Sequence, residues 1–120
     1  MLVLSDYIVK HELKPLKRCF GLRDLMIGAK KVLSGLGQEV NFNADYNFFK
    51  VRIGSRVKGR MIVFVVANKK VVPLLIRLKK DKKIGMNMSA NNTAVVEQVD
   101  RNLQNVIKDI EKGNFQEFEI

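Results

Sequence analysis

Apolar residues recur along the first third of the chain at the spacing of amphipathic helices. In residues 9–20 they are separated by four, three and four positions, and a more regular stripe follows in residues 22–36. Ser5 and Asp6 are suitable N-caps for the first helix, and Pro15 predicts a kink or a later start. Gly21 separates the two stripes, so we expect a helical hairpin.

The centre of the chain, residues 48–83, changes to a period of two, which is typical of strands. Three apolar runs at 49–53, 60–66 and 71–79 are separated by polar breaks. Pro73 cannot donate a hydrogen bond to a neighbouring strand, so it must lie at an edge or a bulge. A consistent register would place the cations of the runs on one open face, with the helices covering the other. These cations are Lys50, Arg52, Arg60, Arg77 and Lys79.

The remaining segments complete one domain. Residues 2–4 predict a short strand added to the edge of the sheet, and residues 38–47 predict a loop. From Thr93 a third helical stripe runs about 20 residues, with Asn92 or Thr93 as its cap and Gly113 as its end. The fold class is therefore α+β: a small twisted antiparallel sheet with an N-terminal helical hairpin on one face and a C-terminal helix. We expect a single domain over residues 1–120, with a core at 1–91 and the C-terminal helix and tail at 92–120.

The charge of the chain is concentrated in the predicted sheet. The whole chain carries +10, whereas residues 48–83 alone hold 12 Lys or Arg residues and one acid, a net charge of +11. Residues 84–120 carry −3. A local field of this sign favours a polyanionic partner, nucleic acid before an acidic protein or an anionic membrane surface.

Composition excludes several other classes of site. No apolar run approaches the roughly 20 residues of a membrane span, which predicts a cytoplasmic protein without a membrane partner. The single cysteine, Cys19, cannot form an internal disulfide, and with only His11 beside it we expect no metal site. The glycine-bounded loop at 54–59 lacks the P-loop pattern. We therefore expect no cofactor.

At this point the chain resembles the RelE/ParE superfamily of toxins from type II toxin–antitoxin modules. The resemblance lies in the helical hairpin at residues 7–36 and in Phe49-Lys50-Val51-Arg52-Ile53-Gly54, followed by Gly59-Arg60-Met61-Ile62-Val63-Phe64. Residues 71–83 resemble the family's last strand with its lysine-rich exit. The long helix after residue 92 exceeds the usual family ending.

The resemblance implies a toxin that cleaves messenger RNA on the ribosome, held in check by a cognate, acidic antitoxin. Two alternatives stay open: a ParE-like toxin that inhibits DNA gyrase by binding, and an RNA- or DNA-binding module without catalysis. No small-molecule cofactor is implied. In the nuclease reading the partners are the ribosome, its mRNA and the antitoxin.

The expected site residues are lysines and arginines of residues 48–83. Arginine offers fixed charge and paired donors to phosphate oxygens, and a lysine whose pKa is lowered by cationic neighbours can move a proton. By their places in the family's pattern, the resemblance implies that the catalytic residues are Lys50, Arg52, Arg60, Lys80 and Lys82. The expected nucleic-acid-binding residues are Arg56, Lys58, Arg77, Lys79 and Lys83.

One departure from the nuclease pattern concerns tyrosine. Many nuclease members place a tyrosine after the last strand, but Tyr7 and Tyr46 both precede the sheet here. His11 lies in the first helix, away from the basic face. Acid–base chemistry would therefore fall to the lysines.

Overall fold

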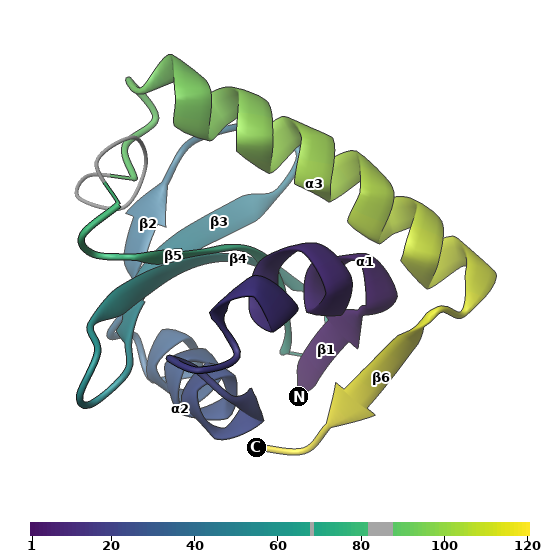
Figure 1. Ribbon diagram of the computed structural model, residues 1–120. Coiled ribbons are helices and arrows are strands. Elements are labelled where there is room, and N and C mark those ends of the chain that lie inside the picture. The colour runs from purple at the N-terminus through teal and green to yellow at the C-terminus, as the bar shows by residue number, and fades with distance from the viewer. Residues whose placement is uncertain (68, 82–87) are drawn as a thin grey trace.

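A computed structural model describes residues 1–67, 69–81 and 88–120. Within these residues the strands form one six-stranded sheet in the order β2-β3-β4-β5-β1-β6 (Figure 1). The strands are β1 Leu2–Ser5, β2 Gln38–Val40, β3 Asn47–Ile53, β4 Gly59–Val66, β5 Lys70–Leu78 and β6 Phe115–Phe118. The α-helices are α1 Asp6–Ile8, α2 Leu22–Leu33 and α3 Thr93–Lys112. The predicted α+β class is confirmed.

The first predicted helix is built from three short pieces rather than one kinked stripe. After α1 the chain forms a π-helical segment, Val9–Leu13, and a 3-10 turn, Lys14–Leu16. The Ser5 hydroxyl accepts a hydrogen bond from the Ile8 amide at 3.2 Å, which confirms the predicted cap. The change from π-helical to 3-10 winding falls at Lys14, directly before Pro15, whose ring cannot continue a regular α-helix.

The strands β3, β4 and β5 form the antiparallel centre of the sheet, as the alternation predicts. The register between β4 and β5 shifts after Ile62, which pairs with Leu75 while Val63 pairs with Pro73. Pro73 therefore lies beside a bulge, and the prediction for this residue is confirmed.

The edges of the sheet differ from the prediction. We expected residues 2–4 at an edge, but β1 lies between β5, to which it is parallel, and β6, to which it is antiparallel. The sheet is therefore mixed. The four residues of β1 are all buried, which is typical of an interior strand, and the C-terminal tail supplies its second neighbour. The predicted loop at 38–47 was also wrong in part, because β2 pairs there with β3.

Helices cover both faces of the sheet, whereas we expected one open face. Helix α2 packs on the face of Val51, and a Cβ atom at Gly28 would lie only 2.8 Å from the Ile53 side chain. Helix α3 covers part of the opposite face, where its Val99 lines a small cavity with Phe48. The face that carries the cations is thus apolar at one end, and this end supplies the partner that the apolar side of α3 needs.

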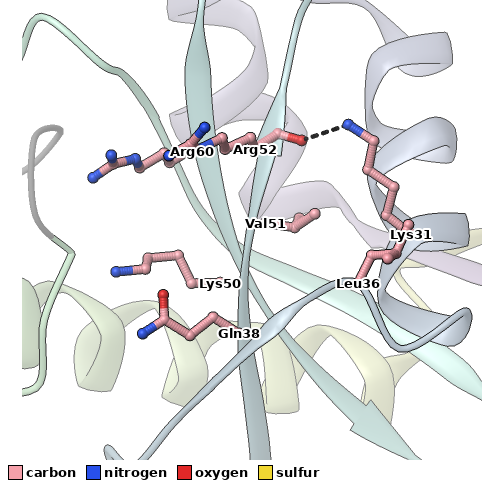
Figure 2. Close-up of a pocket in the computed structure, with 7 residues that line it drawn as sticks. All are labelled: Lys31, Leu36, Gln38, Lys50, Val51, Arg52 and Arg60. Carbon is pink, nitrogen blue, oxygen red and sulfur yellow. Dashed lines mark hydrogen bonds between the residues drawn. The ribbon is translucent and has the colours of Figure 1, made fainter.

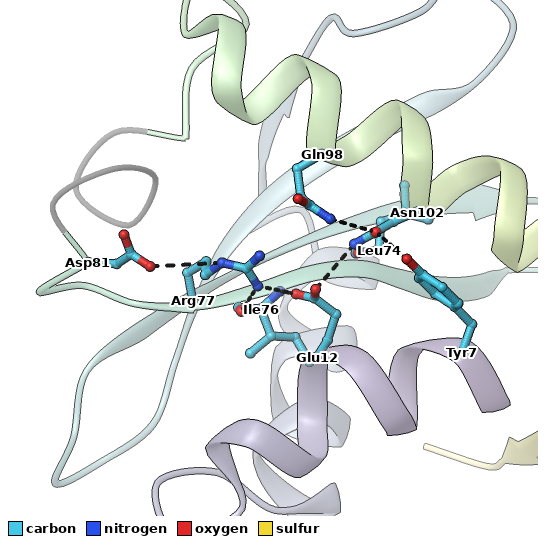
Figure 3. Close-up of polar contacts among 8 residues, drawn as sticks. All are labelled: Tyr7, Glu12, Leu74, Ile76, Arg77, Asp81, Gln98 and Asn102. Atoms are coloured by element: carbon cyan, nitrogen blue, oxygen red, sulfur yellow. Dashed lines mark hydrogen bonds and ion pairs between the residues drawn. The ribbon is translucent and has the colours of Figure 1, made fainter.

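Side chains cap the backbone of β5 beyond its pairing with β1 (Figure 3). The Leu74 carbonyl accepts a hydrogen bond from the Asn102 side chain at 2.7 Å, and the Ile76 amide donates to the Glu12 carboxylate at 2.8 Å. The same carboxylate accepts from Arg77 and from Asn102. Side chains from both ends of the sequence therefore form hydrogen bonds with backbone groups of β5 that would otherwise be unpaired.

The carboxylate of Glu12 is almost fully buried. Burial raises the pKa of Glu12, while the charge of Arg77 and the hydrogen bonds from Ile76, Arg77 and Asn102 act in the opposite direction. A buried carboxylate of this kind is tolerable only while its partners remain in place. Arg77 is itself shared, because its guanidinium also lies 3.9 Å from the Asp81 carboxylate.

This arrangement predicts a pH-dependent effect of Arg77→Met. Without Arg77 the pKa of Glu12 rises further above its unfolded value, so stability falls as pH increases from the unfolded pKa towards the native one. We expect urea denaturation to give a loss of about 3–5 kcal/mol at pH 8 and a smaller loss at pH 5.

The matched control is Lys70→Met, which removes a partly exposed cation 3.4 Å from Glu117. That loss should stay below about 1 kcal/mol at both pH values. An equal loss at pH 5 and pH 8 in Arg77→Met would contradict the role given to Glu12.

Candidate nucleic-acid interface

Three arginines form a row across β3, β4 and β5, next to the β3–β4 hairpin. In the strand register Arg52 of β3 lies opposite Arg60 of β4, and Arg60 lies opposite Arg77 of β5. Lys50 precedes Arg52 by two residues, so alternation places it on the same face. The prediction that these four cations share a face is confirmed, while Lys79 lies just beyond the end of β5.

A pocket of about 380 Å³ lies at the edge of β3 beside this row (Figure 2). We call it the edge pocket. Figure 2 shows Lys50 and Arg60 extending on one side of the strand, and Lys31 reaching the strand from α2 on the other. The pocket is lined by Lys31, Leu36, Gln38, Lys50, Val51, Arg52 and Arg60.

The edge pocket exists because β2 is short. Its first residue, Gln38, pairs with Lys50, so β3 has no neighbour from β2 beyond that point. The Lys31 ammonium group donates a hydrogen bond to the exposed Arg52 carbonyl at 3.4 Å. The strand edge is thus closed by a cation rather than by another strand.

Sequence reasoning missed Lys31, Leu36 and Gln38. Lys31 lies in the last turn of α2, where a basic residue also complements the helix dipole, so its position suggested only a solvated side chain. The sequence contains no signal for the long-range placement of this turn beside β3.

Lys50 has an altered protonation equilibrium. Partial burial lowers the pKa of the Lys50 ammonium group, and the charge of Arg60 lowers it further. The expected lysine with a depressed pKa is therefore present, and burial is the larger cause. Such an amine is neutral in a larger fraction of molecules at neutral pH than an ordinary lysine, which suits it to accept a proton.

One further basic pocket adjoins the edge pocket, and a second adjoins that one. The junction pocket, about 250 Å³, is lined by Lys31, Arg52, Ile53, Gly54, Lys58, Gly59, Arg60 and Lys79. The loop pocket, about 430 Å³, is lined by Arg56, Val57, Lys58, Lys79 and Lys80. A hydrogen bond from the Lys79 amide to the Lys58 carbonyl, 2.9 Å long, joins the β3–β4 loop to the exit of β5.

The predicted site residues are thus divided among three places. Lys50, Arg52 and Arg60 meet in the edge pocket, whereas Lys80 lies in the loop pocket with Arg56. Arg77 shares the face but is held by Glu12 and Asp81. The predicted residues Lys82 and Lys83 lie outside the described part of the chain.

The other chemically notable residues lie in other parts of the fold. His11 stacks on Tyr7 with ring centroids 4.3 Å apart, and Tyr46 packs against Phe64. Cys19 is half-buried against the core. Neither tyrosine lines any of the three basic pockets, whose ionisable side chains among the described residues are lysines and arginines.

Neither a metal-binding cluster nor a membrane-spanning helix is present within the described residues. No group of three or more His, Cys, Asp or Glu side chains there could hold a metal ion. No helix in residues 1–67, 69–81 and 88–120 is long and apolar enough to cross a membrane.

Comparison of the chain with models of protein families, with curated proteins and with solved structures finds no match.

The site predicts a measurable coupling between Lys50 and Arg60. In Arg60→Gln the pKa of Lys50 should rise towards the ordinary lysine value, and it should remain below that value because the burial persists. An NMR pH titration of selectively labelled lysine side chains measures the shift. Lys108→Gln, which removes an exposed cation of α3, serves as the control and should leave the Lys50 titration unchanged. An unaltered Lys50 midpoint in Arg60→Gln would contradict the coupling.

Proposed function

We propose that the edge pocket binds and cleaves RNA, and that the chain is the toxin of a type II toxin–antitoxin module acting on ribosome-bound mRNA. The observation that carries this proposal is the position of Lys50, whose pKa is lowered, beside Arg60 in a pocket lined by cations. The site thus combines a group suited to accept a proton with groups suited to bind a phosphate.

Phosphate binding follows from the types of side chain in the pocket. Arg52 and Arg60 carry guanidinium groups that can donate paired hydrogen bonds to phosphate oxygens. Lys31 adds a third cation from the side of α2. Because these groups come from three different elements, the folded chain positions them before any ligand arrives.

RNA cleavage requires few additional groups. In the proposed step neutral Lys50 accepts the proton of a ribose 2′-hydroxyl, and the 2′-oxygen attacks the adjacent phosphorus. The bond from phosphorus to the 5′-oxygen breaks, and the leaving oxygen takes a proton from a lysine ammonium group of the same pocket. Arg60 and Arg52 stabilise the charge that builds up on the phosphate oxygens. The products are a 2′,3′-cyclic phosphate and a 5′-hydroxyl.

The resemblance to RelE and ParE toxins supports the biological context of this proposal. A cytoplasmic location follows from a ribosomal target. The cognate partner would be an acidic antitoxin that neutralises the basic surface. Such a partner would recognise the net charge of +11 on residues 48–83.

The proposal predicts growth arrest and cleavage of translated mRNA when the chain is expressed in bacteria. Lys50→Ala and Arg60→Ala should each slow cleavage about 10²–10³-fold, because each removes a group that acts in the transition state. Primer extension on mRNA from translating ribosomes measures the cuts, and circular dichroism verifies that the variants are folded. The control is Lys108→Ala, which should cut like the unaltered chain.

The alternatives give different outcomes in the same experiment. Inhibition of gyrase with intact mRNA would select the ParE-like function. Salt-sensitive binding of nucleic acid without growth arrest would select a binding module. Undiminished cleavage by Lys50→Ala would remove Lys50 from the mechanism.

A further inference from the structure

The three basic pockets adjoin one another along the same end of the sheet. The edge pocket and the junction pocket share Lys31, Arg52 and Arg60. The junction pocket and the loop pocket share Lys58 and Lys79. Because neighbouring pockets share lining residues, we call the three together the basic groove.

Exposed apolar side chains lie at both ends of this groove. Leu36 in the edge pocket is 73% exposed, and Val57 in the loop pocket is 38% exposed. They are among the few large apolar side chains that the described residues leave open to solvent. Ile27, also exposed, lines a further pocket beside Lys31.

A groove with both cations and exposed apolar side chains suits a single strand of nucleic acid better than a duplex. A duplex presents phosphates and hides the faces of its bases, whereas a single strand presents both. Single strands are accordingly bound by basic grooves that follow the backbone and by side chains, above all aromatic ones, that contact the bases. The cations of the groove match the first requirement. Leu36 and Val57 offer exposed apolar surface for van der Waals contact with bases, without ring stacking.

We infer that the groove binds one single-stranded RNA segment through at least three consecutive phosphates, and that Lys31 of α2 contacts the phosphate between the edge and loop pockets. The inference rests on the proposed function, which it deepens by naming the form of the substrate. Lys31 has this role because it lines both the edge pocket and the junction pocket.

Binding can be measured without cleavage by using labelled 2′-O-methyl oligouridylates, which lack the attacking hydroxyl. Fluorescence anisotropy with strands about two to eight nucleotides long should show affinity rising with length and levelling off near about four nucleotides. At saturating length, the slope of log affinity against log salt should be about −2 to −3, the value for three or four phosphates on a single strand. A duplex of the same length should bind more weakly.

Neighbouring lysines on α2 provide a matched pair of variants. Lys31→Met should weaken binding about three- to tenfold and reduce the salt slope by about 0.7, the contribution of one phosphate. Lys30→Met removes the same charge one residue away, at an exposed position that lines none of the three pockets, and should have little effect. Lys31→Arg should retain the affinity and the slope.

Several results would overturn the inference. These are equal affinities of Lys31→Met and Lys30→Met, an affinity that does not change with length, no binding of any strand, or tighter binding of the duplex. The proposed cleavage is judged separately from cuts in ribosome-bound mRNA. Binding as described with intact mRNA would refute the cleavage alone, and cut mRNA with no effect of Lys31→Met would refute the groove alone.

Discussion

The row formed by Arg52, Arg60 and Arg77 across three neighbouring strands is the constraint on which the rest of the structure depends. Side chains directly opposite on adjacent strands lie about 4.5–5.5 Å apart at Cβ, and like charges in such positions destabilise a sheet. The strands must therefore be held together by other interactions. Behind the row, Val51, Met61 and Ile76 are buried, and this apolar side of the sheet fixes the register that aligns the arginines.

The arginines at the two ends of the row have different surroundings. Arg77 is tied to the buried carboxylate of Glu12 and to Asp81, and it belongs to the network that caps the edge of β5. Arg52 and Arg60 instead line the pocket that also contains Lys50 and Lys31. One end of the row thus stabilises the fold, while the other end concentrates positive charge at an accessible strand edge. Charge kept at an energetic cost in this way is typical of a functional site.

The sequence was sufficient for the elements whose signals are local. Alternation from Phe49 to Ile53 identified the strand and its basic side, and the cap at Asn92 and the stop at Gly113 bounded the long helix, as the structure confirms. Alternation in the three runs placed five cations on one face. Four of them share it, while Lys79 lies beyond the end of β5. Pro73 indicated its bulge because a proline cannot donate in a strand ladder.

Features that depend on long-range contacts were missed. The position of β1 inside the sheet depends on β6, more than 100 residues away, and the capping of β5 depends on Glu12 and Asn102. Lys31 enters the site only because α2 ends beside the unpaired edge of β3. Spacing along the chain reports which residues share a face, but it does not report which distant elements meet.

The central claim is that RNA binds at the end of the sheet, between Lys50 and the β3–β4 loop. An NMR map of the bound complex tests it most directly. Backbone amide signals of the protein are recorded during titration with an uncleavable tetranucleotide. The account predicts that the largest shifts fall on β3, the start of β4, the β3–β4 loop and the last turn of α2, and that α3 and β6 change little. Dominant shifts on α3 or β6, with the signals around Lys50 and Arg60 unmoved, would contradict it.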